Sequence, residues 1–251
     1  MNKIIVAKIG GSVFSDKSKP YSLRETIIHR LSEIFGKVSK ENTLALVLGG
    51  GSHGHAIVQE LLEKHGKLEN WHVPIINRVM EKLAMKIVGL MEYNDLRPLI
   101  IHPHSTCFFA KNSYQCNFEV AVQAVKRKIH ILSYGDAIVS DRGAYILSGD
   151  DITVELALKL GIDRIFYLSN VDGIMDQTGR VIKETSLNYL LNNITITGSS
   201  GIDVTGGMRK KVESLTKLTK GTEVCIVNGL KPEIVRSALL GTRCKGTLIH
   251  V

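Results

Sequence analysis

Glycine-rich turns between apolar and helical segments place the strongest constraint on how this chain folds. The stretch Val47–Leu62, VLGGGSHGHAIVQELL, puts four glycines and two histidines between an apolar run and a predicted helix. Glycine lets backbone N–H groups approach an anion closely, and the N-terminus of a helix adds a favourable dipole. The turn therefore predicts a phosphate or carboxylate site, and a purely structural turn is the alternative.

Apolar runs of strand length alternate with segments of helical periodicity along the 251 residues. The predicted strands are Ile4–Ile9, Thr43–Leu48, Leu99–Ile101, Ile129–Leu132, Arg164–Leu168, Glu223–Val227 and Thr247–His250. The predicted helices are Leu23–Val38, Ala56–His65, Val79–Met91, Ile152–Leu160 and Met208–Thr219. This alternation predicts an α/β fold, a three-layer αβα sandwich with a central, mainly parallel sheet. Asp136–Leu147 has a charged turn at its centre and predicts a β-hairpin.

Three further turns carry lysine, glycine or carboxylate groups. Lys8–Ser12, KIGGS, ends the first strand, and Ser148–Asp151, SGDD, begins a helix with two carboxylates. Asp203–Glu213, DVTGGMRKKVE, opens another helix and carries Lys211. Turns that follow parallel strands meet at one edge of the sheet, so we expect these groups to converge as equipment for phosphoryl transfer. The chain contains no G-x-x-x-x-G-K-[ST] segment, which excludes a P-loop NTPase.

A dinucleotide-binding site is a weaker interpretation of the first turn. Gly49-x-Gly51-x-x-Gly54 matches the G-x-G-x-x-G fingerprint, but it follows the second predicted strand, whereas the fingerprint follows the first. The acidic residue expected about 20 positions further on should end a strand, yet Glu69 lies in the polar stretch GKLEN. We therefore do not expect NAD.

The charge balance is basic, with 32 lysines and arginines against 24 acidic residues. A net charge of +8 suits either a polyphosphate substrate or a nucleic acid. The basic residues are dispersed, with the densest clusters at Lys126–Lys128 and Arg209–Lys211, and no RNA-binding aromatic motif or zinc finger accompanies them. Nucleic acid would leave the glycine turns unexplained, so we expect no nucleic-acid partner.

Neither a membrane segment nor a secretory signal is apparent. No apolar run approaches the roughly 18 residues that a membrane helix needs, and the N-terminal MNKIIVAKIGG indicates a first strand. We therefore expect a cytoplasmic protein. The four cysteines, at positions 107, 116, 225 and 244, form no C-x-x-C pair and predict free thiols in a reducing compartment. A metal site in which His102 or His104 joins Cys107 and Cys116 is the alternative.

Taken together, these segments resemble the amino acid kinase superfamily. The segments KIGGS, GGGSHGH, SGDD, NVDGI and DVTGGMRKKV occur in that family's order and span nearly the whole chain. Within the superfamily, the segments GGGSHGH, GDAIVSD with SGDDI, DVTGGM and KIGGSVFSDK resemble the isopentenyl phosphate kinase branch, to which the fosfomycin kinases are close. Two positions depart from the pattern: His53 replaces a usual aromatic residue, and Asn170 replaces the first aspartate of D-V-D-G.

The resemblance implies one amino acid kinase domain over residues 1–251, with the acceptor side at about 1–160 and the nucleotide side at about 161–251. It implies transfer of the γ-phosphoryl group of ATP to isopentenyl phosphate, with Mg²⁺ accompanying ATP and no protein ligand of the metal named. A homodimer without a membrane partner is also implied. The alternatives are a fosfomycin-like phosphonate kinase or other phosphate-monoester kinase, a carboxylate or carbamate kinase, and a catalytically silent nucleotide sensor.

The resemblance also implies roles for individual residues. The catalytic residues would be Lys8, Lys17, His55, Asp150 and Lys211, with Asp150 holding the lysines. The acceptor would bind at Gly50, Gly51, Gly54, His55 and Gly149. The nucleotide would bind at Lys8, Gly10, Gly11, Asp172, Gly173, Gly206, Gly207 and Lys211.

The two histidines of the first turn receive different interpretations. We expect His55 to donate a hydrogen bond to the acceptor phosphate, with a helix-capping or packed histidine as the alternative. His53 either lines the pocket or meets solvent, and since side chains two positions apart on a helix point to different faces, the pair is not expected to chelate one metal. Ile75–Met91 and His102–Phe109 are candidate walls for the apolar tail of the acceptor.

Overall fold

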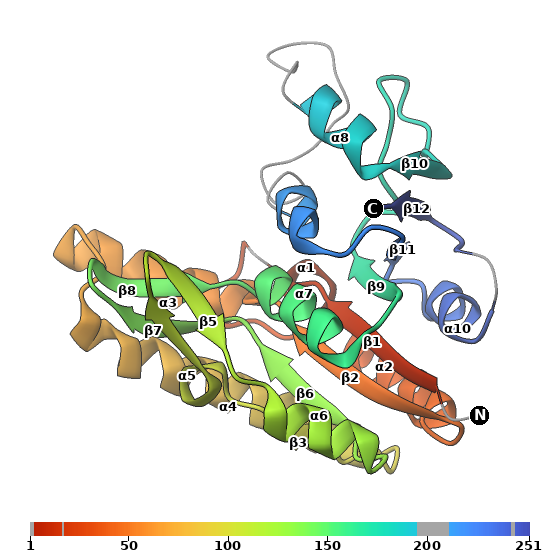
Figure 1. Ribbon diagram of the computed structural model, residues 1–251. Coiled ribbons are helices and arrows are strands. Elements are labelled where there is room, and N and C mark those ends of the chain that lie inside the picture. The colour runs from red at the N-terminus through yellow and green to blue at the C-terminus, as the bar shows by residue number, and fades with distance from the viewer. Residues whose placement is uncertain (1–2, 17, 195–210, 242–243) are drawn as a thin grey trace.

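The computed structural model describes residues 3–16, 18–194, 211–241 and 244–251 (Figure 1). Within them an eight-stranded sheet forms the centre of the molecule. Its strands, from one edge to the other, are β10 (Glu184–Ser186), β12 (Thr247–His250), β11 (Glu223–Asn228), β9 (Arg164–Ser169), β1 (Lys3–Ile9), β2 (Asn42–Leu48), β6 (Ile131–Tyr134) and β3 (Leu99–Ile100). Neighbouring strands are parallel except β11 and β12.

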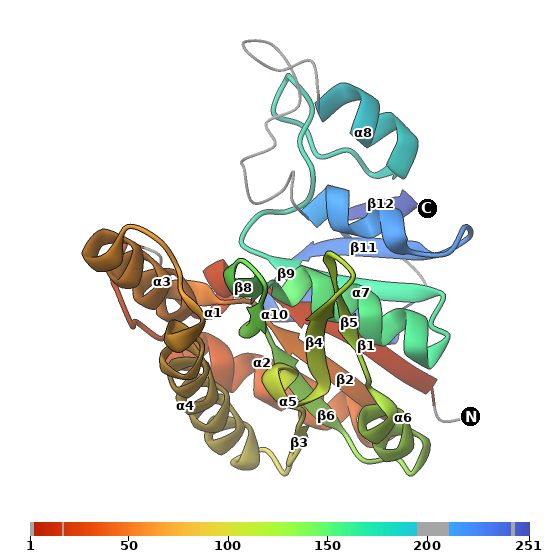
Figure 2. The same cartoon turned by 60° about the vertical axis from the view of Figure 1, so that its left-hand side comes forward.

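Helices cover both faces of the sheet, as predicted (Figure 2). One face packs against α2 (Glu25–Val38), α3 (Gly51–His65), α4 (Val73–Glu92) and α10 (Pro232–Leu240). The other packs against α6 (Glu119–Lys126), α7 (Gly149–Leu160) and α8 (Leu187–Ile194). The three-layer αβα prediction is therefore confirmed, and it has a simple cause: parallel central strands are buried on both faces and are therefore mostly apolar.

The alternation of side chains along β1 determines the face of the sheet on which its one buried charged residue, Lys8, lies. Ile5, Ala7 and Ile9 belong to the core on the α2 side, and Val6 belongs to the core on the α7 side. Because side chains alternate between the two faces of a strand, Lys8 lies on the same face as Val6, under α7. A lysine that is 5% exposed needs a partner there.

In the described part of the chain, two hairpins lie outside the main sheet (Figure 1). The hairpin β7 (Asp136–Ser140) with β8 (Gly143–Leu147) confirms the prediction for this segment. The hairpin β4 (Cys107–Ala110) with β5 (Ser113–Cys116) was not predicted, because its strands are short and show no clear alternation. Short elements complete the description: α1 (Gly11–Phe14), η1 (Asn70–His72), α5 (Pro103–Thr106) and η2 (Leu215–Lys217).

The prediction of free thiols is wrong, since all four cysteines are paired. Cys107 and Cys116 face each other in the register of the β4–β5 hairpin and form one disulfide. Cys225 on β11 forms the other with Cys244, which lies just before β12. Neither sequence separation, 9 and 19 residues, has a spacing rule that could reveal the pairing. Among the described residues, no helix is long and apolar enough to cross a membrane.

Candidate active site

Three of the four turns predicted from the sequence, those at Gly11, Gly51 and Gly149, converge at the carboxyl ends of β1 and β2. They do so through direct backbone contact: a Cβ placed on Gly11 would lie 2.4 Å from the backbone nitrogen of Gly51. A Cβ on Gly149 would lie 2.6 Å from the carbonyl oxygen of Leu48. No side chain fits at either position, and the starts of α1, α3 and α7 are therefore brought together. Three helix N-termini at one sheet edge favour an anion.

Asp150 joins two lysines from distant parts of the chain. Its Oδ2 lies 2.5 Å from Nζ of Lys8, and its Oδ1 lies 3.3 Å from Nζ of Lys211. The two lysine side chains are 6% and 9% exposed, so both charges are buried. Both ammonium groups also lie over the ring of Tyr167, at 5.7 Å and 4.7 Å from its centroid. The predicted lysine–aspartate cluster is thus present as a geometric unit.

The N-terminus of α7 fixes the position of Asp150. Ser148 caps the helix by accepting a hydrogen bond from the backbone N–H of Asp151, and the Asp151 carboxylate accepts one from the backbone N–H of Ser148. This reciprocal capping box holds the first turn of the helix. Asp151 is held further by the hydroxyl of Tyr114, which donates to its carboxylate at 3.0 Å. Asp150, between the two capping residues, therefore has a defined direction.

The pKa values of Lys8 and Asp150 are both lowered in this cluster, for different reasons. Burial, followed by repulsion from Lys211, lowers the pKa of Lys8 from 10.5 to about 8, although Asp150 opposes the change. Burial alone would raise the pKa of Asp150, but attraction to Lys8 and Lys211 outweighs it and lowers that pKa to about 2. The cluster carries two cations against one anion and is therefore suited to receive a further anion.

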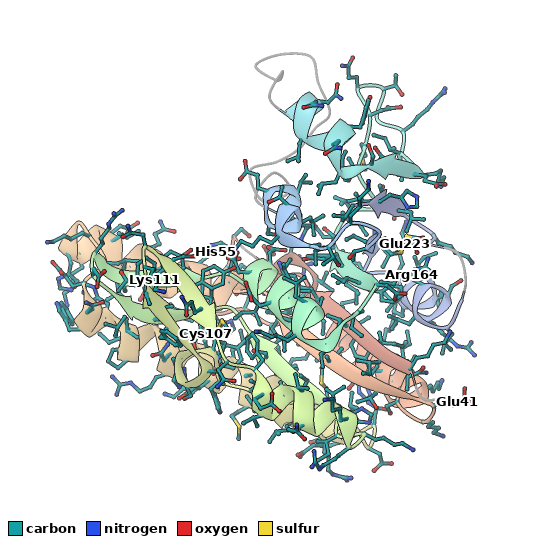
Figure 3. The ribbon with its side chains drawn as sticks, viewed as in Figure 1. Glu41, His55, Cys107, Lys111, Arg164 and Glu223 are labelled. Carbon is teal, nitrogen blue, oxygen red and sulfur yellow. A yellow bond between two sulfur atoms is a disulfide. The ribbon has the colours of Figure 1, made fainter. Side chains whose placement is uncertain are left out.

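The α3 turn places the two predicted histidines in different surroundings. His55 is exposed near the start of α3 (Figure 3). His53 is half-buried and meets the ring of Tyr21 edge-on, with 5.6 Å between ring centroids. Burial, followed by repulsion from Lys86, lowers the pKa of His53. His53 is therefore partly withdrawn from solvent, and its lining of the acceptor pocket stays a prediction.

Gly54 lets α4 pack closely against the turn at the start of α3. A Cβ on Gly54 would lie 3.2 Å from Sδ of Met80, so α4 packs closely under this turn. Gly50 and Gly51 precede it, and the φ of +57° at Gly51 lies in the left-handed region that favours glycine. The glycines predicted to bind the acceptor, Gly50, Gly51 and Gly54, thus form one tight turn.

Asp172 and Gly173 follow β9, near the loop after β1. The Asp172 carboxylate accepts hydrogen bonds from Lys231 at 2.6 Å and Asn228 at 2.9 Å, and these bonds lower its pKa, Lys231 having the larger effect. The side chain of Asn170, which departs from the family pattern, accepts a hydrogen bond from Ser12 at 3.0 Å. This contact links the β9 loop to α1. Lys17, Gly206 and Gly207 lie outside the described residues.

Comparison with known proteins decides the family. A model of the amino acid kinase family matches residues 3–228. The chain belongs to the amino acid kinase family.

Full-length relatives narrow the comparison within this family. The chain is 30% identical over 257 residues to the isopentenyl phosphate kinase of Methanocaldococcus jannaschii, covering 95% of each. It is 30% identical over 251 residues to that of Haloferax volcanii, covering 98% of each. The crystal structure of the Thermoplasma acidophilum isopentenyl phosphate kinase product complex matches all of both chains with a TM-score of 0.75 at 23% identity, which shows a shared fold.

Several residues that support the cluster in this amino acid kinase were not predicted from the sequence. Tyr167 lies within a predicted strand, and nothing in the strand pattern indicates that its ring contacts the ammonium groups of two lysines. Ser148 and Asp151 do carry a local signal, since S-x-x-D before a helical segment is a capping-box pattern. Lys217 and Tyr114, from η2 and β5, meet beside Asp151, and only the tertiary fold brings them there.

Proposed function

We propose that this amino acid kinase transfers the γ-phosphoryl group of ATP to isopentenyl phosphate and forms isopentenyl diphosphate. The observation that carries the proposal is the Lys8–Asp150–Lys211 cluster beside three glycine turns. It occurs in a chain that aligns over nearly its full length with isopentenyl phosphate kinases.

Phosphoryl transfer to a phosphate monoester requires charge neutralisation more than it requires a general base. A phosphate monoester has a second pKa near 6, so at neutral pH its oxygen is already a nucleophile. The difficulty is to bring two polyanions together, because two unit charges about 4 Å apart repel by roughly 4 kcal/mol at an effective dielectric constant of about 20. Buried cations at fixed positions answer this need.

Lys8 and Lys211 are the cations that would meet the transferring phosphoryl group. Each is tied to one oxygen of Asp150, which sets the spacing between them before substrate binds. An arrangement set in advance costs little reorganisation during the reaction. Asp150 acts on the reaction through these lysines and is a positioning residue. Lys17, from the resemblance, would add a third cation.

Backbone groups complete the anion site. Gly10 and Gly11 begin α1, Gly50 and Gly51 begin α3, and Gly149 begins α7. Some of the first N–H groups are already bonded, those of Ser52 and Asp151 to the hydroxyls of Ser15 and Ser148, and that of Gly10 to the carbonyl oxygen of Leu168. The N–H groups of Gly11, Gly51 and Gly149 would therefore be the ones that meet phosphate oxygens. The nucleotide would lie on the side of β9 with Asp172 and Gly173, and the acceptor on the side of α3.

The residues of the site are suited to bind ATP, but Asp150 is not free to bind its Mg²⁺. The glycine cradle and two buried ammonium groups suit a polyphosphate. Both oxygens of Asp150 already hold lysines, so this carboxylate is not offered to a metal. We therefore name no protein ligand for Mg²⁺, which would arrive on the nucleotide oxygens and supply further charge neutralisation.

His55 would recognise the acceptor phosphate, and apolar surface beyond it would hold the isoprenyl tail. An imidazole N–H at the start of α3 adds a donor next to the glycine turn. Ile75–Met91 and His102–Phe109 remain the predicted walls of the tail pocket. Within these ranges, α4 and α5 approach each other at Glu81 and His104, where Nε2 lies 3.2 Å from Oε1.

The test measures ADP release with Mg²⁺-ATP for isopentenyl phosphate, dimethylallyl phosphate, fosfomycin and glutamate. The wild type should turn over the isoprenyl phosphates alone, and His55→Ala should raise their KM. The matched control is His29→Ala, an exposed histidine on α2. It should behave as wild type.

The other outcomes separate the alternatives. Preference for fosfomycin would retain the mechanism and change the acceptor. Turnover of glutamate would point to a carboxylate kinase. Tight ATP binding with no turnover of any acceptor would refute the proposal and favour a nucleotide sensor.

A further inference from the structure

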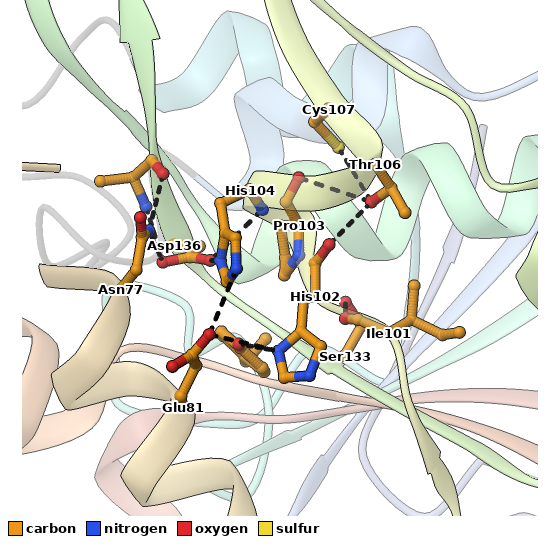
Figure 4. Close-up of polar contacts among 12 residues, drawn as sticks. Asn77, Glu81, Ile101, His102, Pro103, His104, Thr106, Cys107, Ser133 and Asp136 are labelled. Atoms are coloured by element: carbon orange, nitrogen blue, oxygen red, sulfur yellow. Dashed lines mark hydrogen bonds and ion pairs between the residues drawn. The ribbon is translucent and has the colours of Figure 1, made fainter. Parts of the chain in front are cut away.

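Within the described part of the chain, one group of three side chains is arranged to hold a metal ion. Glu81, His102 and His104 each offer one ligand atom, and these atoms all lie within 4.8 Å of one another (Figure 4). We propose that Glu81, His102 and His104 form a binding site for a divalent transition metal ion such as Zn²⁺. The site is distinct from the lysine cluster and from the Mg²⁺ that accompanies ATP.

His104 is oriented as metal-binding histidines usually are. Its Nδ1 lies 2.7 Å from Oδ2 of Asp136, whose side chain is completely buried. Asp136 is itself fixed, since Oδ1 accepts hydrogen bonds from the Asn77 amide at 2.5 Å and the backbone N–H of Ala137 at 2.9 Å. A carboxylate only accepts hydrogen bonds, so the hydrogen on this bond belongs to Nδ1. A carboxylate behind a histidine fixes its tautomer and leaves Nε2 for the metal.

Nε2 of His104 faces an acceptor. It lies 3.2 Å from Oε1 of Glu81, and in the tautomer set by Asp136 both atoms present lone pairs. Either a proton on Nε2 or a metal cation between the two atoms resolves this conflict. Ligand bonds of about 2.0–2.1 Å in a tetrahedral zinc site place ligand atoms about 3.3 Å apart, which is close to the distance found.

His102 supplies the third ligand from the same short segment. Its Nδ1 lies 3.9 Å from Oε1 of Glu81, and both imidazole rings are turned toward this carboxylate (Figure 4). The hydroxyl of the buried Tyr134 lies 2.6 Å from the same nitrogen and competes for its lone pair. Metal binding would release this hydroxyl. Removing it should therefore leave metal affinity intact or improve it.

The composition of the group selects the class of metal. Two imidazoles and one carboxylate suit Zn²⁺, Co²⁺ or Ni²⁺, whereas Mg²⁺ prefers oxygen ligands alone. The side chains are 36% (Glu81), 36% (His102) and 23% (His104) exposed, so an ion can enter from solvent. Three protein ligands leave a fourth position for water. The ion would tie α5 to α4 beside Met80, the residue that packs against Gly54 of the acceptor turn.

The earlier alternative for a metal in this segment used cysteine ligands, and it is wrong. Cys107 and Cys116 are bonded to each other and offer no thiolate. The histidines meet Glu81 and Asp136 instead.

The test uses the full chain, stripped of metal with a chelator and titrated with Co²⁺ and with Zn²⁺ in the absence of nucleotide. We expect one equivalent to bind, and the visible absorption of the Co²⁺ protein should be that of a low-coordinate site with nitrogen ligands. Glu81→Gln and His104→Gln should each weaken binding at least about 10-fold, a loss of the size seen when metal-site residues are altered. Tyr134→Phe should bind at least as tightly as wild type.

A matched control comes from another histidine–glutamate pair on a helix surface. His29 lies 3.9 Å from Glu33 on α2, and His29→Gln should leave metal binding unchanged. Each variant is first shown to keep the wild-type circular dichroism spectrum. Absence of stoichiometric binding by the wild type, or binding that survives both Glu81→Gln and His104→Gln, would overturn the site. In that case His104 is a protonated ion-pair partner of Glu81 and Asp136.

Discussion

Nζ of Lys8 lies 2.5 Å from Oδ2 of Asp150, and the lysine side chain is almost completely buried. The pair connects the second half of β1 to the first turn of α7, two elements far apart in sequence that lie against each other in the fold. A buried lysine is costly unless an opposite charge compensates it. Since Lys211 uses the other oxygen of the same carboxylate, one residue neutralises part of the charge of two.

Asp150→Asn should therefore affect both stability and catalysis. The substitution keeps the shape of the side chain and removes the charge that holds the two lysines. Leaving buried charges unpaired costs about 3–5 kcal/mol of unfolding free energy, and misplaced cations should lower kcat by about 10²–10³-fold. Urea unfolding and ADP release measure the two effects. Asp141→Asn, in the exposed turn between β7 and β8, is the control and should change neither. A variant with wild-type kcat would show that Asp150 does not position the lysines.

The lowered pKa of Lys8 predicts an alkaline limit on substrate binding. Burial and the nearby Lys211 bring this pKa to about 8, so in the free enzyme the ammonium loses its proton above that pH. kcat/KM for ATP should fall as pH rises through about 8. The limit in kcat at saturating substrate should lie higher, because a bound polyanion favours the charged lysine.

The lowered pKa of Lys8 affects folding stability in the opposite direction from activity as pH rises. Between pH 8 and 10.5 the unfolded chain keeps the Lys8 proton while the folded chain releases it, so the contribution of Lys8 to folding becomes more favourable as pH rises. Lys8→Arg separates this residue from other titrating groups, because a guanidinium stays charged throughout the range. The variant will be less active, yet its alkaline limit should disappear. A limit near pH 8 that persists in Lys8→Arg would assign it to another group.

Contact between glycine turns predicts a steric effect at Gly11. A methyl group there would lie 2.4 Å from the backbone nitrogen of Gly51, and backbone cannot move aside as a flexible side chain can. Gly11→Ala should cost about 1–3 kcal/mol and raise the KM for ATP. Gly89→Ala is the control, because this exposed glycine of α4 has no atom within 4 Å of the added methyl, and alanine should stabilise the helix by up to about 1 kcal/mol. Equal stability of the two variants would contradict the tight contact.

The strands that are buried on both faces of the sheet could be predicted from the sequence. β1, β2, β9 and β11 were found because their apolar runs fill both faces of a parallel sheet. The start of α3 at Gly51 was missed by the periodicity, which predicted a start at Ala56, because glycines carry no hydrophobic signal. The boundary there is set by the packing of one glycine turn on another, which only the fold provides.

The site was predictable in part for a similar reason. Lys8, Asp150 and Lys211 could be named from the resemblance, since each lies in a recognisable segment. Glu81 and His104 could not be paired, because the helix that carries Glu81 and the segment that carries His104 are separate in sequence and no spacing rule joins them. The pairing of Cys225 on β11 with Cys244 before β12 could not be predicted either, because no motif links the two positions.

The Cys225–Cys244 disulfide gives the last prediction. It closes a loop with a sequence separation of 19 around α10, and Cys225 is completely buried. By loss of chain entropy in the unfolded state, a cross-link of this size contributes about 3 kcal/mol. Replacing both residues, Cys225→Ala with Cys244→Ala, should lower the unfolding free energy by about that amount. The reductant-induced drop in Tm should also become smaller in the double variant than in wild type, because only Cys107–Cys116 remains to be reduced. Thiol titration of the unfolded, non-reduced wild type should find no free cysteine. Four reactive thiols, with a Tm indifferent to reductant, would show that the pairs do not form in solution.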